Sequence, residues 1–275
     1  MSKYIGVFDS GVGGLTVVKG LIQALPNENI VYLGDSKNMP YGSKTNSQII
    51  ECVQGAVKFL NTFDLKTIVI ACNTADSIAS NTIKQMYDLP IYGVIVPAAK
   101  KACATTKNNK IGVIATSAAI NSNEYEKHIH AYNSNIEVFS KACPFLAPLI
   151  EEGKFDIGNN EIRNMIIDYL DPIVEKRIDT LILGCTHYDL IESIVHDIYP
   201  GLMLVSSSKC VIDNVKNGID LDNNEVPDRQ YYVSADKDKF KKIVSTFMGD
   251  IKIKQIKEDW ILFNNGGPNR NRTCI

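Results

Sequence analysis

Two cysteines occupy the same place in two similar stretches of the chain. Cys72 and Cys185 each follow a Thr, three aliphatic residues and one small residue, and polar residues come next, in the stretches TIVIACNTADSI (67–78) and TLILGCTHYDLI (180–191). Each thiol stands between a buried type of strand and a possible helix start. Because a helix N-terminus stabilises an anion, we expect it to lower a thiol pKa below the free value of about 8.5.

The matched pair narrows the chemistry that these thiols could perform. A nucleophilic thiol enzyme needs one thiol and one base, and His187 could assist Cys185 in that way. A redox pair would need the two sulfurs close together, and a metal pair would need more ligands. Inversion of a carbon centre does require two like groups, because one removes a proton from one face and the other returns a proton to the opposite face. Such a reaction at an amino-acid α-carbon needs a dry site and well-placed hydrogen-bond donors.

Candidate donors follow the other predicted strands. Asp9 and Ser10 lie in FDSGVGG, directly after the first strand, where they could meet a ligand or cap the next helix. Tyr41 and Gly42 lie in the turn PYGS, which could offer a hydroxyl and a backbone N–H. The glycines after the first strand form neither a GxxxxGK[ST] nor a GxGxxG pattern, which disfavours a nucleotide site.

The elements that must position these residues alternate between strand and helix. The helical periodicity of 49–63, 162–173 and 234–249 has apolar residues at steps of three and four. The predicted strands are continuously apolar, as in a parallel sheet covered on both faces: 4–8, 30–33, 67–71, 91–95, 110–115, 136–139, 180–184 and 202–205. An edge strand is expected at 251–256 because its apolar residues alternate. The fold class is therefore α/β with mostly parallel sheets, and ligands are expected beyond the carboxyl ends of the strands.

A second pair of similar stretches supports an internal repeat. IGVFDSG (5–11) resembles IGVIATS (111–117), in the same order and at a similar offset as the cysteine stretches. We therefore predict two pseudo-symmetric α/β domains with the active site in the cleft between them. The expected bounds are 1–97 plus 208–263 for a discontinuous first domain, 98–207 for the second, and 264–275 for a loose C-terminal tail.

Composition excludes several classes of protein. The net charge of −2 gives no electrostatic reason to expect nucleic acid or an anionic membrane as a partner. No apolar run approaches the roughly 18 to 20 residues that span a bilayer, and the N-terminus has no signal-peptide pattern. Seven cysteines without a CxxC pair argue against a disulfide framework and against zinc. We expect a cytoplasmic protein.

Five motifs together resemble one family. In order along the chain, the motifs GVFDSGVGGLTV, PYG, ACNTA, ACPFLAPLIEEG and LGCTHY resemble the glutamate racemases, over about residues 4 to 200. The resemblance implies a cofactor-independent, metal-free, cytoplasmic and usually dimeric enzyme that makes D-glutamate for peptidoglycan. It implies that Cys72 takes the proton from D-glutamate and Cys185 takes it from L-glutamate.

The same resemblance implies roles for the neighbours of the two thiols. Asp9 supports the first thiol and contacts the substrate ammonium, while His187 and Glu151 support the second thiol, with the adjacent Glu152 as the alternative to Glu151. The implied substrate contacts are Asp9, Ser10, Tyr41, Gly42, Asn73, Thr74, Thr116, Thr186 and His187.

Two other functions stay open on the sequence. The first is racemisation of aspartate or a hydantoin, because that superfamily shares the paired cysteines. The second is a non-catalytic protein that closes two α/β lobes on a small ligand, which explains the repeat but not the matched thiols.

Overall fold

The computed structural model describes residues 3–256, and within them the strands form two sheets. One sheet has six strands in the order β10-β9-β2-β1-β3-β4, and the other has four in the order β6-β5-β7-β8. All strand pairs in both sheets are parallel. Residues 257–263 of the predicted first domain and the predicted tail 264–275 lie outside the described residues, and the exact domain bounds stay a prediction.

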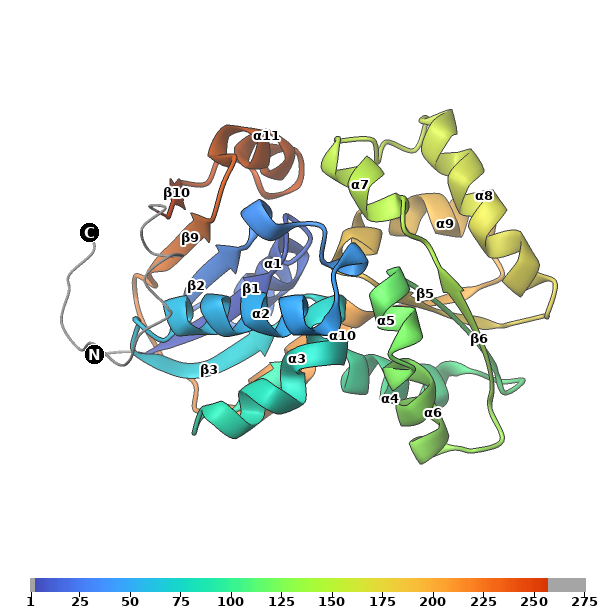
Figure 1. The fold of residues 1–275 in the computed structure, drawn as a ribbon, viewed down its shortest axis with the longest axis horizontal. Coiled ribbons are helices and arrows are strands. Elements are labelled where there is room, and N and C mark those ends of the chain that lie inside the picture. The colour runs from blue at the N-terminus through green and yellow to red at the C-terminus, as the bar shows by residue number, and fades with distance from the viewer. Residues whose placement is uncertain (1–2, 257–275) are drawn as a thin grey trace.

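The six-stranded sheet takes strands from both ends of the described chain. Its strands are β1 (Tyr4–Asp9), β2 (Asn29–Gly34), β3 (Leu65–Ile70), β4 (Ile91–Gly93), β9 (Arg229–Val233) and β10 (Ile253–Gln255). The helices and 3₁₀ turns that join them are α1 (Leu15–Ala24), η1 (Ser36–Asn38), η2 (Tyr41–Ser43), α2 (Asn46–Leu60), α3 (Asn73–Met86) and α11 (Lys237–Met248). In Figure 1 this lobe is on the left, with α2 and α3 in front of the sheet.

The four-stranded sheet is formed by the middle of the chain. Its strands are β5 (Lys110–Ala115), β6 (Glu137–Ala142), β7 (Thr180–Gly184) and β8 (Met203–Ser206). The helices around it are α4 (Ile95–Thr105), α5 (Ser117–Asn121), α6 (Glu124–Tyr132), α7 (Leu146–Glu151), α8 (Asn160–Val174), the 3₁₀ turn η3 (Thr186–Ile191), α9 (Glu192–Ile198) and α10 (Ser207–Gly218). Figure 1 places α7, α8 and α9 above this sheet and α4 and α6 below it.

The strand order repeats between the two sheets. The order β2-β1-β3-β4 in one corresponds to β6-β5-β7-β8 in the other, so β1 matches β5 and β3 matches β7. These are the strands that carry the two pairs of similar sequence stretches. The predicted α/β class and the predicted internal repeat are therefore confirmed, and the two cysteines follow equivalent strands.

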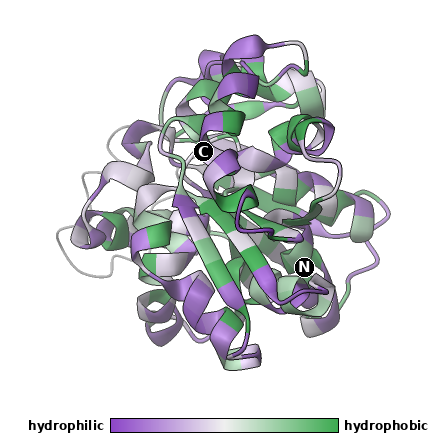
Figure 2. Cartoon of the chain, turned by 90° about the vertical axis from the view of Figure 1, so that its right-hand side faces the viewer, coloured by the Kyte–Doolittle hydropathy of each residue, from purple (hydrophilic) through white to green (hydrophobic). Residues whose placement is uncertain are grey.

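Burial explains why the chain forms these layers. Most strand residues are fully buried, and α2 and α8 bury one apolar stripe each, through side chains such as Val53, Val57, Ile166 and Leu170. Figure 2 shows hydrophobic residues along the strands and hydrophilic residues along the outer helix faces. Removing these side chains from water is the main term that holds the layers together.

Three local expectations differ from the structure. The strand β9 was not expected, because its first residues, Arg229 and Gln230, are polar and only tertiary pairing between β2 and β10 makes it a strand. The apolar run 91–95 ends as a strand at Gly93, and α4 begins at Ile95. The stretch after Cys185 begins as the 3₁₀ turn η3, not as an α-helix. In the described part of the chain, no helix is long and apolar enough to cross a membrane.

Candidate active site

A cavity of about 230 Å³ lies where the carboxyl ends of the two sheets face each other. It is lined by residues of both lobes, and among them are Cys72 and Cys185. The lining residues are Ser10, Met39, Pro40, Tyr41, Gly42, Cys72, Asn73, Thr74, Thr116, Ala147, Pro148, Glu151, Glu152, Cys185, Thr186, His187 and Lys239. All the residues predicted for the site line this cavity except Asp9.

The first thiol stands at the N-cap of α3, at the end of β3. Cys72 is 6% exposed, and its Sγ lies 3.5 Å from the Ser10 hydroxyl. Burial raises the pKa of this thiol to about 12 and the negative charge of Asp9 adds to the rise, while Ser10 and the Ala75 N–H of α3 lower it. The expectation that the helix start lowers this pKa below its free value is wrong for Cys72, because desolvation of a buried anion outweighs two hydrogen bonds.

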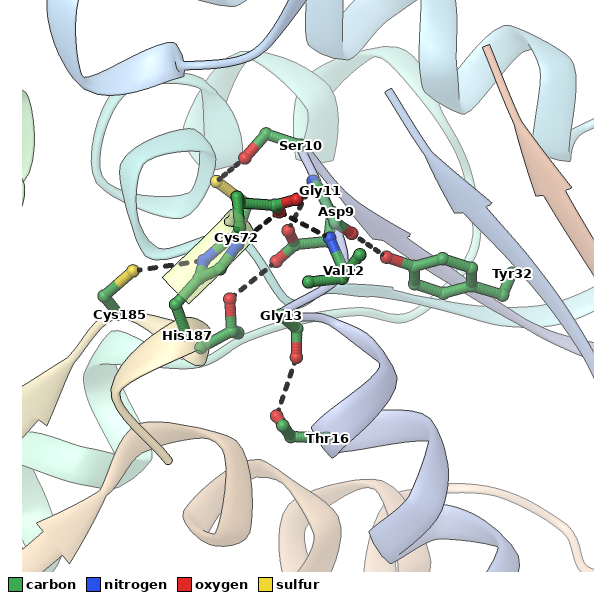
Figure 3. Close-up of polar contacts among 12 residues, drawn as sticks. Asp9, Ser10, Gly11, Val12, Gly13, Thr16, Tyr32, Cys72, Cys185 and His187 are labelled. Carbon is green, nitrogen blue, oxygen red and sulfur yellow. Dashed lines mark hydrogen bonds and ion pairs between the residues drawn. The ribbon is translucent and has the colours of Figure 1, made fainter. Parts of the chain in front are cut away.

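The second thiol stands at the end of β7, and it has a histidine beside it. The Cys185 Sγ lies 3.6 Å from His187 Nδ1, and His187 Nε2 lies 2.7 Å from Glu151 Oε1. Figure 3 shows Cys185 and Cys72 approaching from different elements, with His187 beside Cys185. The two thiols therefore have different partners, as their different sequence neighbours indicated.

A buried ion pair holds His187 in its charged form. Burial opposes the charge on His187, but its contacts with Cys185 and Glu151 outweigh burial and raise its pKa well above the ordinary value. Burial also opposes the charge on Glu151, but His187, the Val12 N–H and the positive charge of Lys239 lower the pKa of Glu151. The result is an imidazolium next to Cys185, which is a fitting counter-ion for a thiolate.

Each lobe supplies a carboxylate that accepts a hydrogen bond from the other lobe. Asp9, from β1, accepts from the Thr186 hydroxyl at 3.0 Å, and Glu151, from α7, accepts from the Val12 N–H at 3.0 Å. Asp9 also accepts from the Gly11 N–H at 2.8 Å. The contacts of Asp9 with Thr186 and of Glu151 with Val12 join the two lobes beside the cavity.

Asp9 is buried behind the cavity wall and does not reach the cavity itself. It is 0% exposed, and burial raises its pKa to about 6, although the charge of His187 and the hydrogen bonds from Gly11 and Thr186 lower it. In this structure Asp9 therefore acts on the site through Thr186 and through its charge on Cys72, and its contact with a ligand ammonium, implied by the family resemblance, stays a prediction.

The glycines of FDSGVGG permit the close approach of the lobes. A Cβ at Gly11 would lie 2.4 Å from Glu151 Oε1. A Cβ at Gly13 would lie 2.4 Å from Thr186 Oγ1 and 2.8 Å from both the backbone nitrogen and Nδ1 of His187. The motif is thus neither a phosphate cradle nor only a tight turn. Gly11 and Gly13 are required because side chains of the second lobe occupy the space that a Cβ would need, whereas a Cβ at Gly14 would lie 2.3 Å from the Asp9 Cβ of its own lobe.

The remaining predicted residues are arranged around the thiols. Thr74 and Thr116 face each other with their hydroxyl oxygens 2.7 Å apart. Asn73 donates to the Ser207 hydroxyl at 3.0 Å and accepts from the Tyr125 hydroxyl. The Tyr41 hydroxyl donates to Asp35 at 2.7 Å, so its proton is committed within its own lobe.

Several residues that support the site were missed in the sequence. Asp35 holds Tyr41, Ser207 and Tyr125 hold Asn73, and Tyr32 donates its hydroxyl proton to the Gly11 carbonyl (Figure 3). Only Asp35 could have been found from the sequence, because it lies at the carboxyl end of β2 as Asp9 lies at the carboxyl end of β1. The other three are distant in sequence and carry no local signal.

A second hollow, of about 330 Å³, adjoins the first at Gly42. It is lined by the turn after η2 and by α5, with Lys44 as its titratable residue and no cysteine. Because its lining has no pair of like acid–base side chains, it does not suit a two-base reaction. Among residues 3–256, no group of three or more His, Cys, Asp or Glu is placed to hold a metal ion.

The chain is similar to known proteins along most of its length. Residues 5–216 match the Asp/Glu/hydantoin racemase family. A glutamate racemase from Sulfurihydrogenibium sp. (strain YO3AOP1) is 41% identical over 255 residues, which cover 92% of this chain and 96% of that protein.

Solved structures agree with that result. A glutamate racemase isoform from Bacillus anthracis superposes with a TM-score of 0.88 at 36% identity, covering 94% of this chain and 98% of that one. A glutamate racemase from Francisella tularensis, solved in complex with D-glutamate, superposes with a TM-score of 0.84 at 35% identity and covers 93% and 97%.

Proposed function

This chain is an isomerase of the Asp/Glu/hydantoin racemase family, and we propose that it interconverts L- and D-glutamate with Cys72 and Cys185 as the two proton carriers. One observation supports the mechanism above the others. The two thiols follow equivalent strands, β3 and β7, and both line one cavity between the lobes. A pseudo-symmetric pair is what delivery to opposite faces of one carbon requires.

In the proposed L-to-D reaction, Cys185 acts as the base beside the His187 imidazolium and Cys72 acts as the acid. Burial and Asp9 raise the pKa of Cys72 to about 12, which suits a proton donor, and the Cys185 Sγ lies 3.6 Å from the Nδ1 of the buried His187. The form that accepts D-glutamate has the proton on Cys185 and the charge on Cys72.

Each step of the proposed reaction transfers one proton between a thiol and the α-carbon. The Cys185 thiolate takes the α-proton of L-glutamate, so that an S–H bond forms and the Cα–H electron pair moves into the substrate carboxylate. The Cys72 thiol then donates its own proton to the opposite face of the α-carbon and becomes the thiolate. The reverse sequence converts D-glutamate. Donors at the cavity wall stabilise the charge that develops on the carboxylate.

Three groups of donors suit the substrate. We propose that Ser10 and the Thr74–Thr116 pair offer hydroxyl groups and that Asn73 offers the second N–H of its amide. Gly42 and Thr186 offer their backbone N–H groups, because the Thr186 hydroxyl already donates to Asp9. Because the Tyr41 hydroxyl is bonded to Asp35, Tyr41 contributes its position in the wall and its backbone. Asp9 supports Cys72 from behind the wall, and His187 with Glu151 supports Cys185.

The test of the two-thiol assignment is a set of single substitutions. Cys72→Ser and Cys185→Ser should each reduce net racemisation of glutamate by more than about 100-fold, because each removes one acid–base group. The matched control is Cys103→Ser, since Cys103 lies in α4 and does not line the cavity. A wild-type rate in either active-site variant would refute the proposal.

Glutamate is proposed as the substrate because the full-length relatives above are named glutamate racemases. Comparing kcat/KM for glutamate and aspartate tests this choice. A preference for aspartate would overturn the substrate and leave the two-thiol chemistry in place. Binding of glutamate without any turnover would favour the non-catalytic binding protein instead.

The cellular role and the oligomeric state are inferred from the same family resemblance. We propose that the protein works in the cytoplasm as a homodimer, without a cofactor, and supplies D-glutamate for peptidoglycan. Rescue of a bacterial strain that requires D-glutamate tests the cellular role, and sedimentation equilibrium tests the dimer.

A further inference from the structure

The mouth of the cavity carries three charged side chains besides His187. Glu151 and Glu152 come from the end of α7, and Lys239 comes from the first turn of α11. Figure 1 shows α11 at the top of the first lobe, with α7 of the second lobe next to it. No other Lys or Arg is among the lining residues.

The two carboxylates already have cationic partners. Glu151 lies 2.7 Å from His187 Nε2, and Glu152 lies 3.0 Å from Lys154 Nζ. Lys239 is exposed, and within residues 3–256 it has no carboxylate within ion-pair distance. Its positive charge nonetheless reaches into the cavity, where it contributes, after His187 and the Val12 N–H, to keeping the pKa of Glu151 low against the effect of burial.

We infer that Lys239 is an entrance residue that attracts the acidic amino acid into the cavity and favours its binding over that of a neutral one. The inference rests on the proposed function, because it concerns how that substrate reaches the thiols. Glutamate carries two carboxylates and one ammonium, so it arrives as an anion. Because Glu151 and Glu152 are each paired with a cation, Lys239 is the charge at the cavity that is left to attract this anion.

The chemistry of lysine suits this position. Its ammonium is a compact charge on a flexible four-carbon stem, so it can follow an anion inward without a fixed geometry. A charge at the rim of a low-dielectric cleft raises the local concentration of the oppositely charged ligand. Such an interaction is made equally in the ground state and the transition state, so it lowers KM and leaves kcat unchanged.

The experiment compares three variants of the full chain. Lys239→Gln removes the charge, Lys239→Arg restores it, and Lys242→Gln removes an exposed charge on the same helix that does not line the cavity. Initial rates with L- and D-glutamate are measured at low salt and at about 0.2 M added salt, where exposed charges are screened within about 10 Å.

The expected result is a change in KM alone. At low salt, Lys239→Gln should lower kcat/KM by about 3- to 10-fold with kcat within two-fold of wild type. The difference should shrink at high salt. Lys239→Arg and Lys242→Gln should behave as wild type. A merely structural role of Lys239 would not produce this salt dependence.

Two results would overturn the inference. One is a wild-type kcat/KM and salt dependence in Lys239→Gln, and the other is an equal loss in Lys242→Gln. Either result leaves the racemase assignment standing if the wild-type protein racemises glutamate. A wild-type protein without that activity would instead overturn the proposed function itself.

Discussion

Replacing Glu151 by Gln isolates the charge that supports the second thiol. Glu151 is 6% exposed and His187 is 4% exposed, and the pair is 2.7 Å apart. A Gln oxygen can accept the same two hydrogen bonds, from His187 and from the Val12 N–H, so the shape of the site is kept. The substitution removes the negative charge that favours the imidazolium.

The size of the effect follows from the difference between a charged and a neutral hydrogen bond. A bond to a charged group contributes about 1.5–3 kcal/mol and a neutral one about 0.5–1.5 kcal/mol. The loss of about 1–1.5 kcal/mol corresponds to a roughly 10-fold fall in kcat/KM, at about 1.4 kcal/mol per factor of ten. L- and D-glutamate have equal free energies, so kcat/KM must fall by the same factor in both directions.

The asymmetry of the site should appear in deuterium isotope effects. Weaker support of Cys185 slows proton transfer at Cys185, so that step limits the rate more. The isotope effect on kcat/KM should therefore rise for L-glutamate labelled at the α-carbon and fall for labelled D-glutamate. The matched control is Glu152→Gln, which removes a neighbouring carboxylate that is paired with Lys154, and it should leave both isotope effects unchanged.

Two outcomes would refute this reasoning. If Glu151→Gln keeps kcat/KM within two-fold of wild type, the charge on Glu151 does not support catalysis. If the isotope effects change in the opposite sense, Glu151 and His187 act on Cys72 and not on Cys185.

Three further predictions concern packing, pH and hydroxyl contacts. Gly13→Ala should abolish activity and lower the melting temperature, because its Cβ would lie 2.4 Å from Thr186 Oγ1. The control is Gly55→Ala in α2, where a Cβ has nothing within 4 Å, and it should stabilise the fold by about 0.5–1 kcal/mol. Equal melting temperatures for the two variants would contradict this prediction. Burial raises the pKa of Asp189 from 3.8 to about 6, so its protonated form favours the folded state, and its contribution to stability is complete below pH 4 and lost as the pH rises through 6. Asp189→Asn should therefore be more stable than wild type above pH 6, by up to about 3 kcal/mol in urea unfolding, and equal to it near pH 4; a gap that is constant with pH would refute the assignment. Tyr41→Phe should leave kcat/KM within about three-fold of wild type and cost about 1 kcal/mol of stability, because its hydroxyl bonds Asp35 and not a ligand; a loss of activity above 100-fold would show a direct substrate contact.

The sequence carried enough information for the fold class and for the repeat. Parallel strands buried on both faces read as continuous apolar runs, and β1, β3, β5 and β7 all have that pattern. Because polar residues at the carboxyl ends of parallel strands meet at one edge, strand-end residues such as Ser10, Cys72 and Cys185 could be predicted without coordinates. Lys239, which lies on a helix far along the chain, could not. The 3₁₀ turn after Cys185 could not, since its hydrogen bonds depend on how the chain leaves β7.

The contacts between lobes were beyond the reach of the sequence. Val12 and Glu151 are 139 residues apart, and Asp9 and Thr186 are 177 apart. Nothing local to Asp9 indicates that its carboxylate is fully buried and accepts a hydrogen bond from the Thr186 hydroxyl. The raised pKa of Cys72 has the same origin. A helix N-terminus is visible in a sequence, but the desolvation that outweighs it depends on how closely the lobes approach.

The most direct test of the two-thiol account is racemisation in D₂O, followed at low conversion. Each thiol carries a single hydrogen, so the thiol that donates to the product supplies deuterium, whereas the thiol that removes the substrate proton can only return that same proton. Starting from L-glutamate, the D-glutamate formed should contain deuterium at the α-carbon while the remaining L-glutamate keeps its protium, and the converse should hold from D-glutamate. Deuterium appearing in the unreacted enantiomer as fast as in the product, or a product that retains the substrate proton, would contradict the account.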